Sequence, residues 1–257
     1  MTNHVLVEKS AQLLVLTLNR TDKKNALTRD MYATLAAHIE SANDDPEIRC
    51  MLLQANGDMF TAGNDLADFA ASNSSTAKPT LEDNIPLLPA LRGARKPLVA
   101  AVNGRAVGIG FTLLLHCDLV FVSEDAVLTA PFVNLALVPE AASSWLLPLL
   151  IGHVRAFETF VLGAPVDAHK AVAWGIANRA VPAAELRDIA RAAALAIAAR
   201  APSAVLATKR LLRDDDALRD RMNVEFEYFV RQLKSPEFKE AFNAFAERRA
   251  ADFSRFQ

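Results

Sequence analysis

Three closely spaced glycines stand in the most apolar stretch of the chain, residues 96–122: Gly104, Gly108 and Gly110. They would leave the opening turn of a helix without side-chain bulk, so that its unpaired N–H groups could face a ligand. Because a helix N-terminus favours negative charge, such a turn could stabilise an oxyanion. The alternative is that the glycines only let a helix pack tightly, and their spacing alone fits both interpretations.

The same stretch does not fit the common glycine-rich nucleotide motifs or a membrane span. The pattern Gly104-x-x-x-Gly108-x-Gly110 differs from the dinucleotide-binding fingerprint, and no Gly-Lys-Ser/Thr follows it as in a phosphate loop. Its uncharged run, residues 106–117, is too short to cross a bilayer, and Asp118 ends it.

Glu140 is a second candidate catalytic residue because it is an acidic residue in a predominantly apolar segment. Pro139 suits the entry to a helix, and residues 141–147 are expected to continue as that helix. Glu140 is therefore expected in or next to the first helical turn. From the residues alone, the simpler interpretation is a carboxylate that the helix dipole stabilises.

Metal-dependent and nucleophilic catalysis have little support in the sequence. The five histidines show no His-Glu-x-x-His or other ligand spacing, so we expect no metal site. Ser143 and Ser144 lack the Gly-x-Ser-x-Gly context of an activated serine. His116 and Cys117 are adjacent and cannot converge on one target from a helix, so His116 is interpreted as a core residue.

The elements that would position these residues form an α/β chain. Strands are expected at residues 5–7, 14–18, 48–54, 98–102, 119–122 and 127–130, with a last extended piece at 176–181. Helices are expected after Thr28, at 108–116, at 141–147, at 153–162, and between Asp167 and Gly175.

A shift to an all-helical pattern divides the chain into a core, residues 1–182, and a C-terminal region, residues 183–257. Breaks at Pro202, at residues 214–216 and at residues 235–236 predict four helices in the second region. Its last 32 residues hold seven of the fourteen phenylalanines, which we expect to pack on the core or on another subunit.

Composition limits the possible partners and compartment. The net charge of −2 and the absence of a Lys/Arg block argue against nucleic acid or an anionic membrane as the main partner. Cys50 and Cys117 lie in apolar runs, where buried free thiols in a reducing compartment are expected. The N-terminal residues show no signal or transit peptide, so the expected location is the cytoplasm.

Two separated loops together resemble the enoyl-CoA hydratase/isomerase (crotonase) superfamily. The first reads Phe-x-Ala-Gly-x-Asp-Leu at residues 60–66, and the second reads Asn-Gly-x-Ala-x-Gly-x-Gly at residues 103–110. The similarity extends to Lys-Asn-Ala-Leu at residues 24–27, to residues 131–135 and to Phe-x-Glu-Arg-Arg at residues 245–249. The resemblance implies the crotonase (ClpP-like) α/β fold, a spiral of ββα turns. It also implies a C-terminal helical region that builds a homotrimer or a hexamer, as a dimer of trimers.

The resemblance implies an acyl-CoA thioester as substrate and two backbone N–H groups that bind its carbonyl oxygen. By motif position these belong to Asn64 and Ile109. Ile109 replaces the usual glycine, which leaves its N–H available unless the position requires a positive φ. One such donor contributes about 3 to 4 kcal/mol of transition-state stabilisation in comparable sites.

Other positions are matched to substrate and CoA contacts only through the resemblance. Lys24 would lie near the CoA phosphates, and Ala62 and Leu66 near its adenine. The full set of matched binding positions is Lys24, Ala26, Ala62, Asp65, Leu66, Gly108, Phe132, Phe229, Phe245 and Arg248. Coenzyme A enters as part of the substrate, so no separate cofactor is implied.

The acid–base positions point to the type of reaction. Hydratases of the family use two glutamates, but the matched positions here hold Thr112 and Phe132, which cannot accept a proton. Residues 139–144, Pro-Glu-Ala-Ala-Ser-Ser, resemble the Pro-Glu-x-x-Ser-Ser segment of Δ3,Δ2-enoyl-CoA isomerases. The resemblance therefore implies isomerisation of a 3-enoyl-CoA to a 2-enoyl-CoA with Glu140 as the base. Enoyl-CoA hydration or another crotonase reaction, such as thioester cleavage, is the alternative. A non-catalytic acyl-CoA-binding or scaffold protein is the second.

Overall fold

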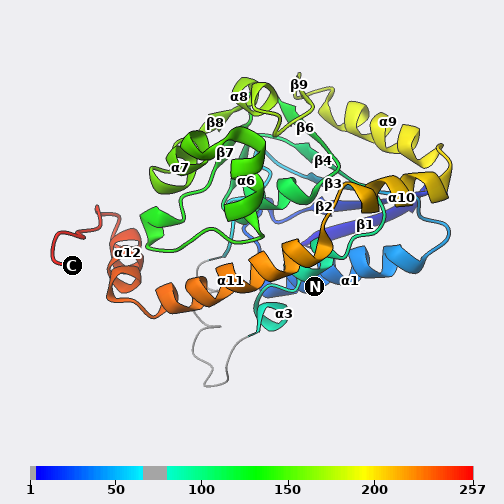
Figure 1. Ribbon diagram of the computed structural model, residues 1–257. Coiled ribbons are helices and arrows are strands. Elements are labelled where there is room, and N and C mark those ends of the chain that lie inside the picture. The colour runs from blue at the N-terminus through cyan, green and yellow to red at the C-terminus, as the bar shows by residue number, and fades with distance from the viewer. Residues whose placement is uncertain (1–3, 66–79, 257) are drawn as a thin grey trace.

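A six-stranded sheet forms the centre of the computed structural model, which describes residues 4–65 and 80–256 (Figure 1). The strand order is β1-β2-β3-β4-β6-β9, and every neighbouring pair is parallel except β1 and β2. The strands are β1 (Val5–Ser10), β2 (Leu13–Leu18), β3 (Cys50–Ala55), β4 (Leu98–Val102), β6 (Leu119–Ser123) and β9 (Arg179–Val181).

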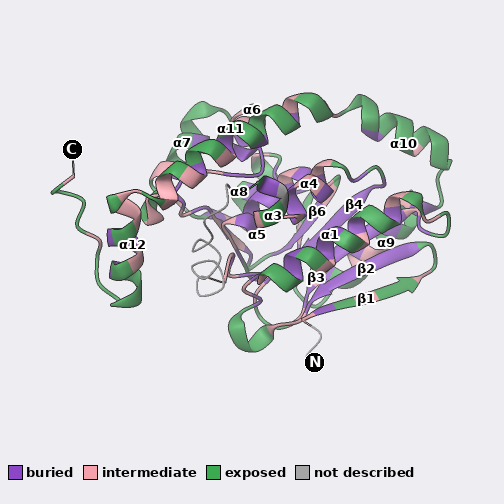
Figure 2. Ribbon diagram, turned by 90° about the horizontal axis from the view of Figure 1, so that it is seen from below, coloured by how far each residue is buried: buried purple, intermediate pink, exposed green. Residues whose placement is uncertain are grey.

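The inner strands of this sheet are buried on both faces. Successive side chains of a strand point to opposite sides, so each strand contributes to two cores. In β2, Leu14 and Leu16 join one apolar core, whereas Leu13 and Val15 join the other. Helix α1 (Arg29–Asp44) covers the first face, and the Thr28 hydroxyl caps it by accepting from the Met31 N–H. Helix α9 (Leu186–Ala198) covers the second face with alanines at four-residue steps. Figure 2 colours the central strands as buried, and Figure 1 shows α9 above them and α1 below.

A second sheet of three strands lies beside the glycine-rich segment. Its order is β5-β7-β8, with the strands β5 (Arg105–Val107), β7 (Val127–Thr129) and β8 (Val166–Asp167). The short strand β5 was not predicted. The helix predicted at 108–116 is one α-helical turn, α5 (Ile109–Thr112), which continues as the 3₁₀ helix η2 (Leu113–His116).

The predicted helix start at residue 141 is wrong. Helix α6 spans Ser143–Ile151, because Ala141 and Ala142 have positive φ angles of 63° and 55° and so cannot be helical. The remaining helices among the described residues before residue 183 are η1 (Thr21–Lys23), α3 (Leu81–Asn84), α4 (Leu87–Arg92), η3 (Val133–Leu135), α7 (His153–Val161) and α8 (Ala168–Ala173).

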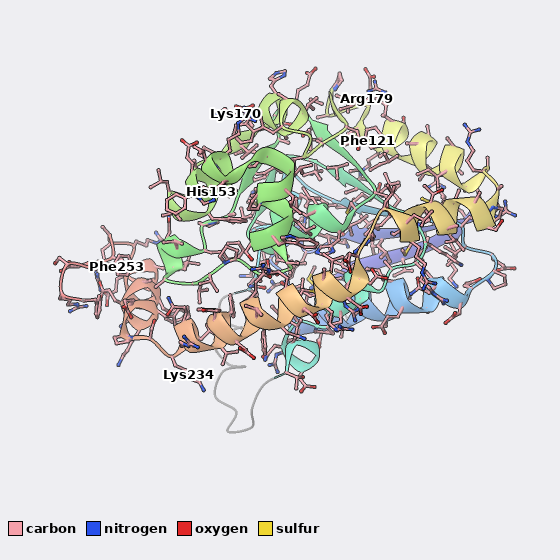
Figure 3. All side chains as sticks on the ribbon, in the orientation of Figure 1. Phe121, His153, Lys170, Arg179, Lys234 and Phe253 are labelled. Atoms are coloured by element: carbon pink, nitrogen blue, oxygen red, sulfur yellow. The ribbon has the colours of Figure 1, made fainter. Side chains whose placement is uncertain are left out.

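Four helices follow β9, with breaks where the sequence predicts them. After α9 come α10 (Pro202–Leu211), α11 (Asp215–Leu233) and α12 (Pro236–Ala246). The side chains of Asp214 and Ser235 cap α11 and α12 by accepting backbone N–H bonds. Figure 3 shows Lys234 and Phe253 at the α12 end of the molecule, away from α9 and α10. The mixed α/β class is confirmed, and the division at residue 182 stays a prediction.

Within the described residues, no single helix is long and apolar enough to cross a membrane, and α9 and α10 pass that test only as a pair bent by 106°.

Candidate active site

The two predicted loops lie side by side. Thr61 and Ala106 form a parallel bridge, in which the Thr61 N–H donates to the Arg105 carbonyl and the Val107 N–H donates to the Thr61 carbonyl. A Cβ atom on Gly63 would lie 2.9 Å from the Val107 carbonyl oxygen. Because this approach leaves no room for a side chain, glycine at residue 63 is required for the loops to meet.

The glycines of the second loop serve both of the purposes considered from the sequence. A Cβ on Gly110 would lie 2.3 Å from Thr61 Cγ2, so this glycine permits tight packing. Gly108 differs, because it has a φ of +56° and a Cβ there would meet no atom within 4 Å. Gly108 also lines an apolar cavity, so its open side faces space that a ligand could occupy.

Asn64 and Ile109, the predicted N–H donors, lie at the same cavity. Both residues line it, and in the described part of the chain neither N–H has an acceptor. The Asn64 side chain is held by Tyr32, whose hydroxyl donates to Asn64 Oδ1. Ile109 is the first residue of α5, and its φ is not positive, so replacement of the family's usual glycine leaves the N–H available. Two residues whose backbone N–H groups have no acceptor among the described residues therefore line one apolar cavity.

This cavity has a volume of about 460 Å³ and a predominantly apolar wall. The two loops supply one side of it, and helices α11 and α12 supply another. Its main apolar side chains are Phe132, Leu135, Leu137, Phe229, Phe238, Phe242 and Phe245. A wall of this kind excludes water from bound substrate and strengthens electrostatic interactions inside.

Glu140 is buried next to the helix that carries the Ile109 N–H. The Thr112 hydroxyl, one turn further along α5, donates to Glu140 Oε1 at 2.5 Å. Glu140 Oε2 is buried without a hydrogen-bond partner, and no ion pair to Glu140 is present among the described residues. Glu140 is not itself a cavity-lining residue, although Leu137, three residues earlier, is one.

The burial of Glu140 changes its acidity. Burial raises the pKa of Glu140 to about 8, against a smaller lowering by the Thr112 hydrogen bond, and the carboxyl of Glu225 raises it further. A carboxyl with a pKa near neutrality can both accept and return a proton, which suits a general acid–base. The alternative interpretation of Glu140, as a carboxylate stabilised by a helix dipole, is not supported because α6 begins three residues later.

The carboxyl of Glu225, from α11, is the acidic group that contacts the start of α6. Its two oxygens accept hydrogen bonds from the N–H groups of Ala142, at 2.6 Å, and Ser144, at 2.8 Å. On the other side of the turn, His116 Nε2 donates to the Ala141 carbonyl at 2.7 Å. Burial lowers the pKa of His116 to about 4, so the ring is neutral at physiological pH. Sequence reasoning identified His116 only as a core residue and missed Glu225, because no local spacing connects either one with Glu140.

The first group of predicted CoA contacts lies around the residue-62 loop. Ala62 lines the cavity, and its N–H donates to the Lys24 carbonyl. The Lys24 ammonium is exposed and pairs with Asp58 at 2.8 Å. Asp65 pairs with Arg20 at 2.7 Å, and Arg20 also donates to the Ala26 carbonyl. Leu66 lies outside the described residues.

The second group lies in the C-terminal helices. Phe229 is buried and Phe245 is exposed, and both line the cavity together with Phe132 of the preceding core. Arg248 is not a lining residue, whereas the next residue, Arg249, is one. Arg249 pairs with Glu240 and with Glu247, each at 2.6 Å. The structure therefore brings seven of the predicted residues to one cavity: Ala62, Asn64, Gly108, Ile109, Phe132, Phe229 and Phe245. Glu140 and its partner Thr112 do not line this cavity.

The described residues contain no cluster of three or more His, Cys, Asp or Glu side chains that could hold a metal ion. Cys50 and Cys117 are free thiols, and burial raises the pKa of each to about 12. Neither is therefore a thiolate nucleophile at neutral pH.

Comparison with known proteins adds independent information. A family model described as enoyl-CoA hydratase/isomerase matches residues 8–255. The chain is 30% identical to the 1,2-epoxyphenylacetyl-CoA isomerase of Escherichia coli K12, covering 99% of each protein. It is 31% identical to the 2,3-dehydroadipyl-CoA hydratase of the same organism, covering 98% of each. The crystal structure of an enoyl-CoA hydratase/isomerase from Pseudoalteromonas atlantica T6c is 42% identical, with a TM-score of 0.91 over 98% of this chain and 100% of that chain.

Proposed function

This chain belongs to the enoyl-CoA hydratase/isomerase (crotonase) family and shares its acyl-CoA chemistry, and we propose that its own reaction moves a double bond from a 3-enoyl-CoA to the 2-enoyl-CoA. The names of the relatives do not decide between reactions, because an isomerase and a hydratase are almost equally similar to the chain. The choice therefore rests on the acid–base groups of the site.

The observation that carries the proposal is the environment of Glu140. Its Oε2 atom is buried and without a partner, and burial raises the pKa of this carboxyl to about 8. The other buried acid nearby, Glu225, has both oxygens engaged by backbone N–H groups. Thr112 and Phe132, which match the glutamate positions of hydratases, cannot take a proton. One available acid and an apolar cavity favour proton transfer within the substrate over the addition of water.

The proposed mechanism uses Glu140 twice. As a carboxylate it removes a proton from C2 of the 3-enoyl thioester, and the C2–H electron pair moves into a dienolate. The N–H groups of Asn64 and Ile109 donate to the dienolate oxygen, where negative charge develops. Glu140, now a carboxylic acid, gives the same proton to C4, and the conjugated 2-enoyl thioester forms. No water is consumed, and substrate and product are isomers.

Hydration of a 2-enoyl-CoA is the second candidate, favoured by the similarity to the 2,3-dehydroadipyl-CoA hydratase. It requires one group to activate water and one to protonate carbon, as in the two-glutamate members of the family. A non-catalytic acyl-CoA-binding or scaffold protein is the third candidate. Each of the three predicts a different result with the same two substrates.

The purified protein is incubated separately with 3-hexenoyl-CoA and with crotonyl-CoA, and products are separated by chromatography and identified by mass. We expect conversion of 3-hexenoyl-CoA to 2-hexenoyl-CoA without a change of mass, and little 3-hydroxybutyryl-CoA from crotonyl-CoA. Rapid gain of one water by crotonyl-CoA would replace the isomerase proposal with a hydratase. Inertness toward both esters and a wider panel of enoyl-CoA thioesters would favour a binding protein.

We further propose that the chain works as a homotrimer or hexamer in the cytoplasm. The free thiols of Cys50, which is buried, and Cys117, which is partly buried, support a reducing compartment. Exposed apolar side chains in the helical part of the molecule support assembly with further copies.

A further inference from the structure

The turn that follows Glu140 has an unusual backbone. Ala141 and Ala142 are consecutive non-glycine residues in the left-handed region, with φ angles of 63° and 55°. Residues with a Cβ atom are strained in this region, so the surrounding structure must hold the pair in place. Because Glu140 directly precedes this pair, the turn sets the direction in which its side chain leaves the backbone.

Hydrogen bonds from three sources hold this turn. Within the turn, the Ser143 N–H donates to the Glu140 carbonyl at 3.1 Å. From η2, His116 Nε2 donates to the Ala141 carbonyl, while His116 Nδ1 accepts from Arg213 at 3.3 Å. From α11, the Glu225 carboxyl accepts from Ala142 and Ser144. Figure 1 shows α11 running beneath α6, so this last contact joins the C-terminal helices to the segment that carries Glu140.

The electrostatic setting of the two carboxyls is asymmetric. Burial raises the pKa of Glu225 to about 7, and its backbone hydrogen bonds and the nearby Arg221 act in the opposite direction. His116 is neutral in the working pH range, and Arg213 lies on the far side of its ring. Among these groups, the Glu225 carboxylate is the one whose negative charge opposes ionisation of Glu140.

We propose that Glu225 is a positioning residue that holds the left-handed turn after Glu140 and so sets both the direction and the acidity of the catalytic carboxyl. The C-terminal helix α11 thereby completes the active site from outside the sheet core. This inference rests on the proposed role of Glu140, but it concerns Glu225, which does not line the cavity.

The test compares Glu225→Gln with a matched control, Glu227→Gln, on the exposed side of the same helix. A glutamine can accept one N–H with its oxygen, but its NH2 group faces the second N–H and cannot accept from it. We expect kcat for the 3-enoyl-CoA to fall about 10- to 100-fold, because small displacements of a catalytic group are costly. KM should change far less, and Glu227→Gln should behave as the native protein.

The pH profile separates positioning from simple loss of folded protein. Loss of the negative charge at residue 225 removes a cause of the raised Glu140 pKa, so the acid limb of kcat should move to lower pH. Partial unfolding would lower kcat without moving that limb. Native kcat together with a native acid limb in Glu225→Gln would overturn the proposal.

A second readout keeps the inference separate from the proposed function. Infrared difference spectra recorded across a pH titration report the carboxylic acid band of Glu140, identified by its absence in Glu140→Gln. A shift of its midpoint to lower pH in Glu225→Gln supports the inference even if the native protein has no isomerase activity. If isomerase activity requires Glu140 but Glu225→Gln shifts neither the acid limb nor the infrared midpoint, the proposed function stands and the role proposed for Glu225 is wrong.

If Glu225→Gln does not fold, Glu225→Asp replaces it. We expect this variant to have a lower kcat with a retained acid limb, and a native kcat would overturn the proposal.

Discussion

At the residue scale, Thr112 determines what Glu140 can do. A hydroxyl at this position donates to one carboxyl oxygen and leaves the other without a partner. A second glutamate in its place would add like charge to a buried site and provide a second proton carrier. With a threonine rather than a glutamate at residue 112, the site has a single atom free for acid–base chemistry, Glu140 Oε2.

This environment predicts the pH dependence of catalysis. Glu140 must be ionised to remove the C2 proton, and burial raises the pKa of its carboxyl to about 8. The active carboxylate is lost as pH falls and gained as pH rises. The raised pKa of the folded state places this change near pH 8. We expect kcat/KM for a 3-enoyl-CoA to increase between pH 6 and 9, with an inflection at about 8. An inflection near the ordinary pKa of a glutamate would contradict the buried, unpaired carboxyl.

A site residue can be predicted from the sequence when it lies in a short motif, and not when its partners are distant in the sequence. Asn64, Ile109 and Glu140 lie in short motifs, so a resemblance identified them, although their roles stay predictions. Glu225 acts on Ala142 from a distant helix, and its hydrogen bonds depend on the packing of α11. An acidic residue in an amphipathic helix resembles any solvent-exposed glutamate, so its sequence carries no signal for burial.

At the element scale, side-chain periodicity predicts the long strands and helices well. The strand at 98–102 and the four C-terminal helices follow from apolar runs, caps and prolines. The errors occur where pairing or backbone strain decides the structure. Strand β5 has three residues and exists through its pairing with β7, which no local pattern reveals. The start of α6 is displaced because Glu225 stabilises a left-handed turn in place of the first helical residues.

At the scale of the whole molecule, the cavity depends on both parts of the chain. The α/β core supplies Asn64 and Ile109 to the lining, whereas α11 and α12 supply aromatic side chains. The expectation that C-terminal phenylalanines pack on the core or another subunit fits this arrangement: Phe229 is buried, and Phe245 lines the cavity yet remains exposed in the single chain.

The exposed apolar surface predicts assembly. Large apolar side chains are exposed on or next to α6, α7 and α10, including Leu149, Val154, Leu162, Leu211 and Leu212. Because single-chain proteins rarely leave large contiguous apolar patches uncovered, we expect these helices to contact further copies of the chain. Light scattering coupled to size-exclusion chromatography should give three or six times the chain mass of 27.9 kDa. A monomer at micromolar concentration would exclude the proposed assembly.

The most direct test of the central claim is the kinetic and binding comparison of the native protein with Glu140→Gln. The substitution keeps the size of the side chain but removes the atom proposed to carry the proton between C2 and C4. We predict that kcat for 3-hexenoyl-CoA falls at least about 100-fold, while calorimetry shows nearly unchanged affinity for a 2-enoyl-CoA. Turnover by Glu140→Gln at a rate close to that of the native protein would contradict the account, because the proton would then be moved by another group.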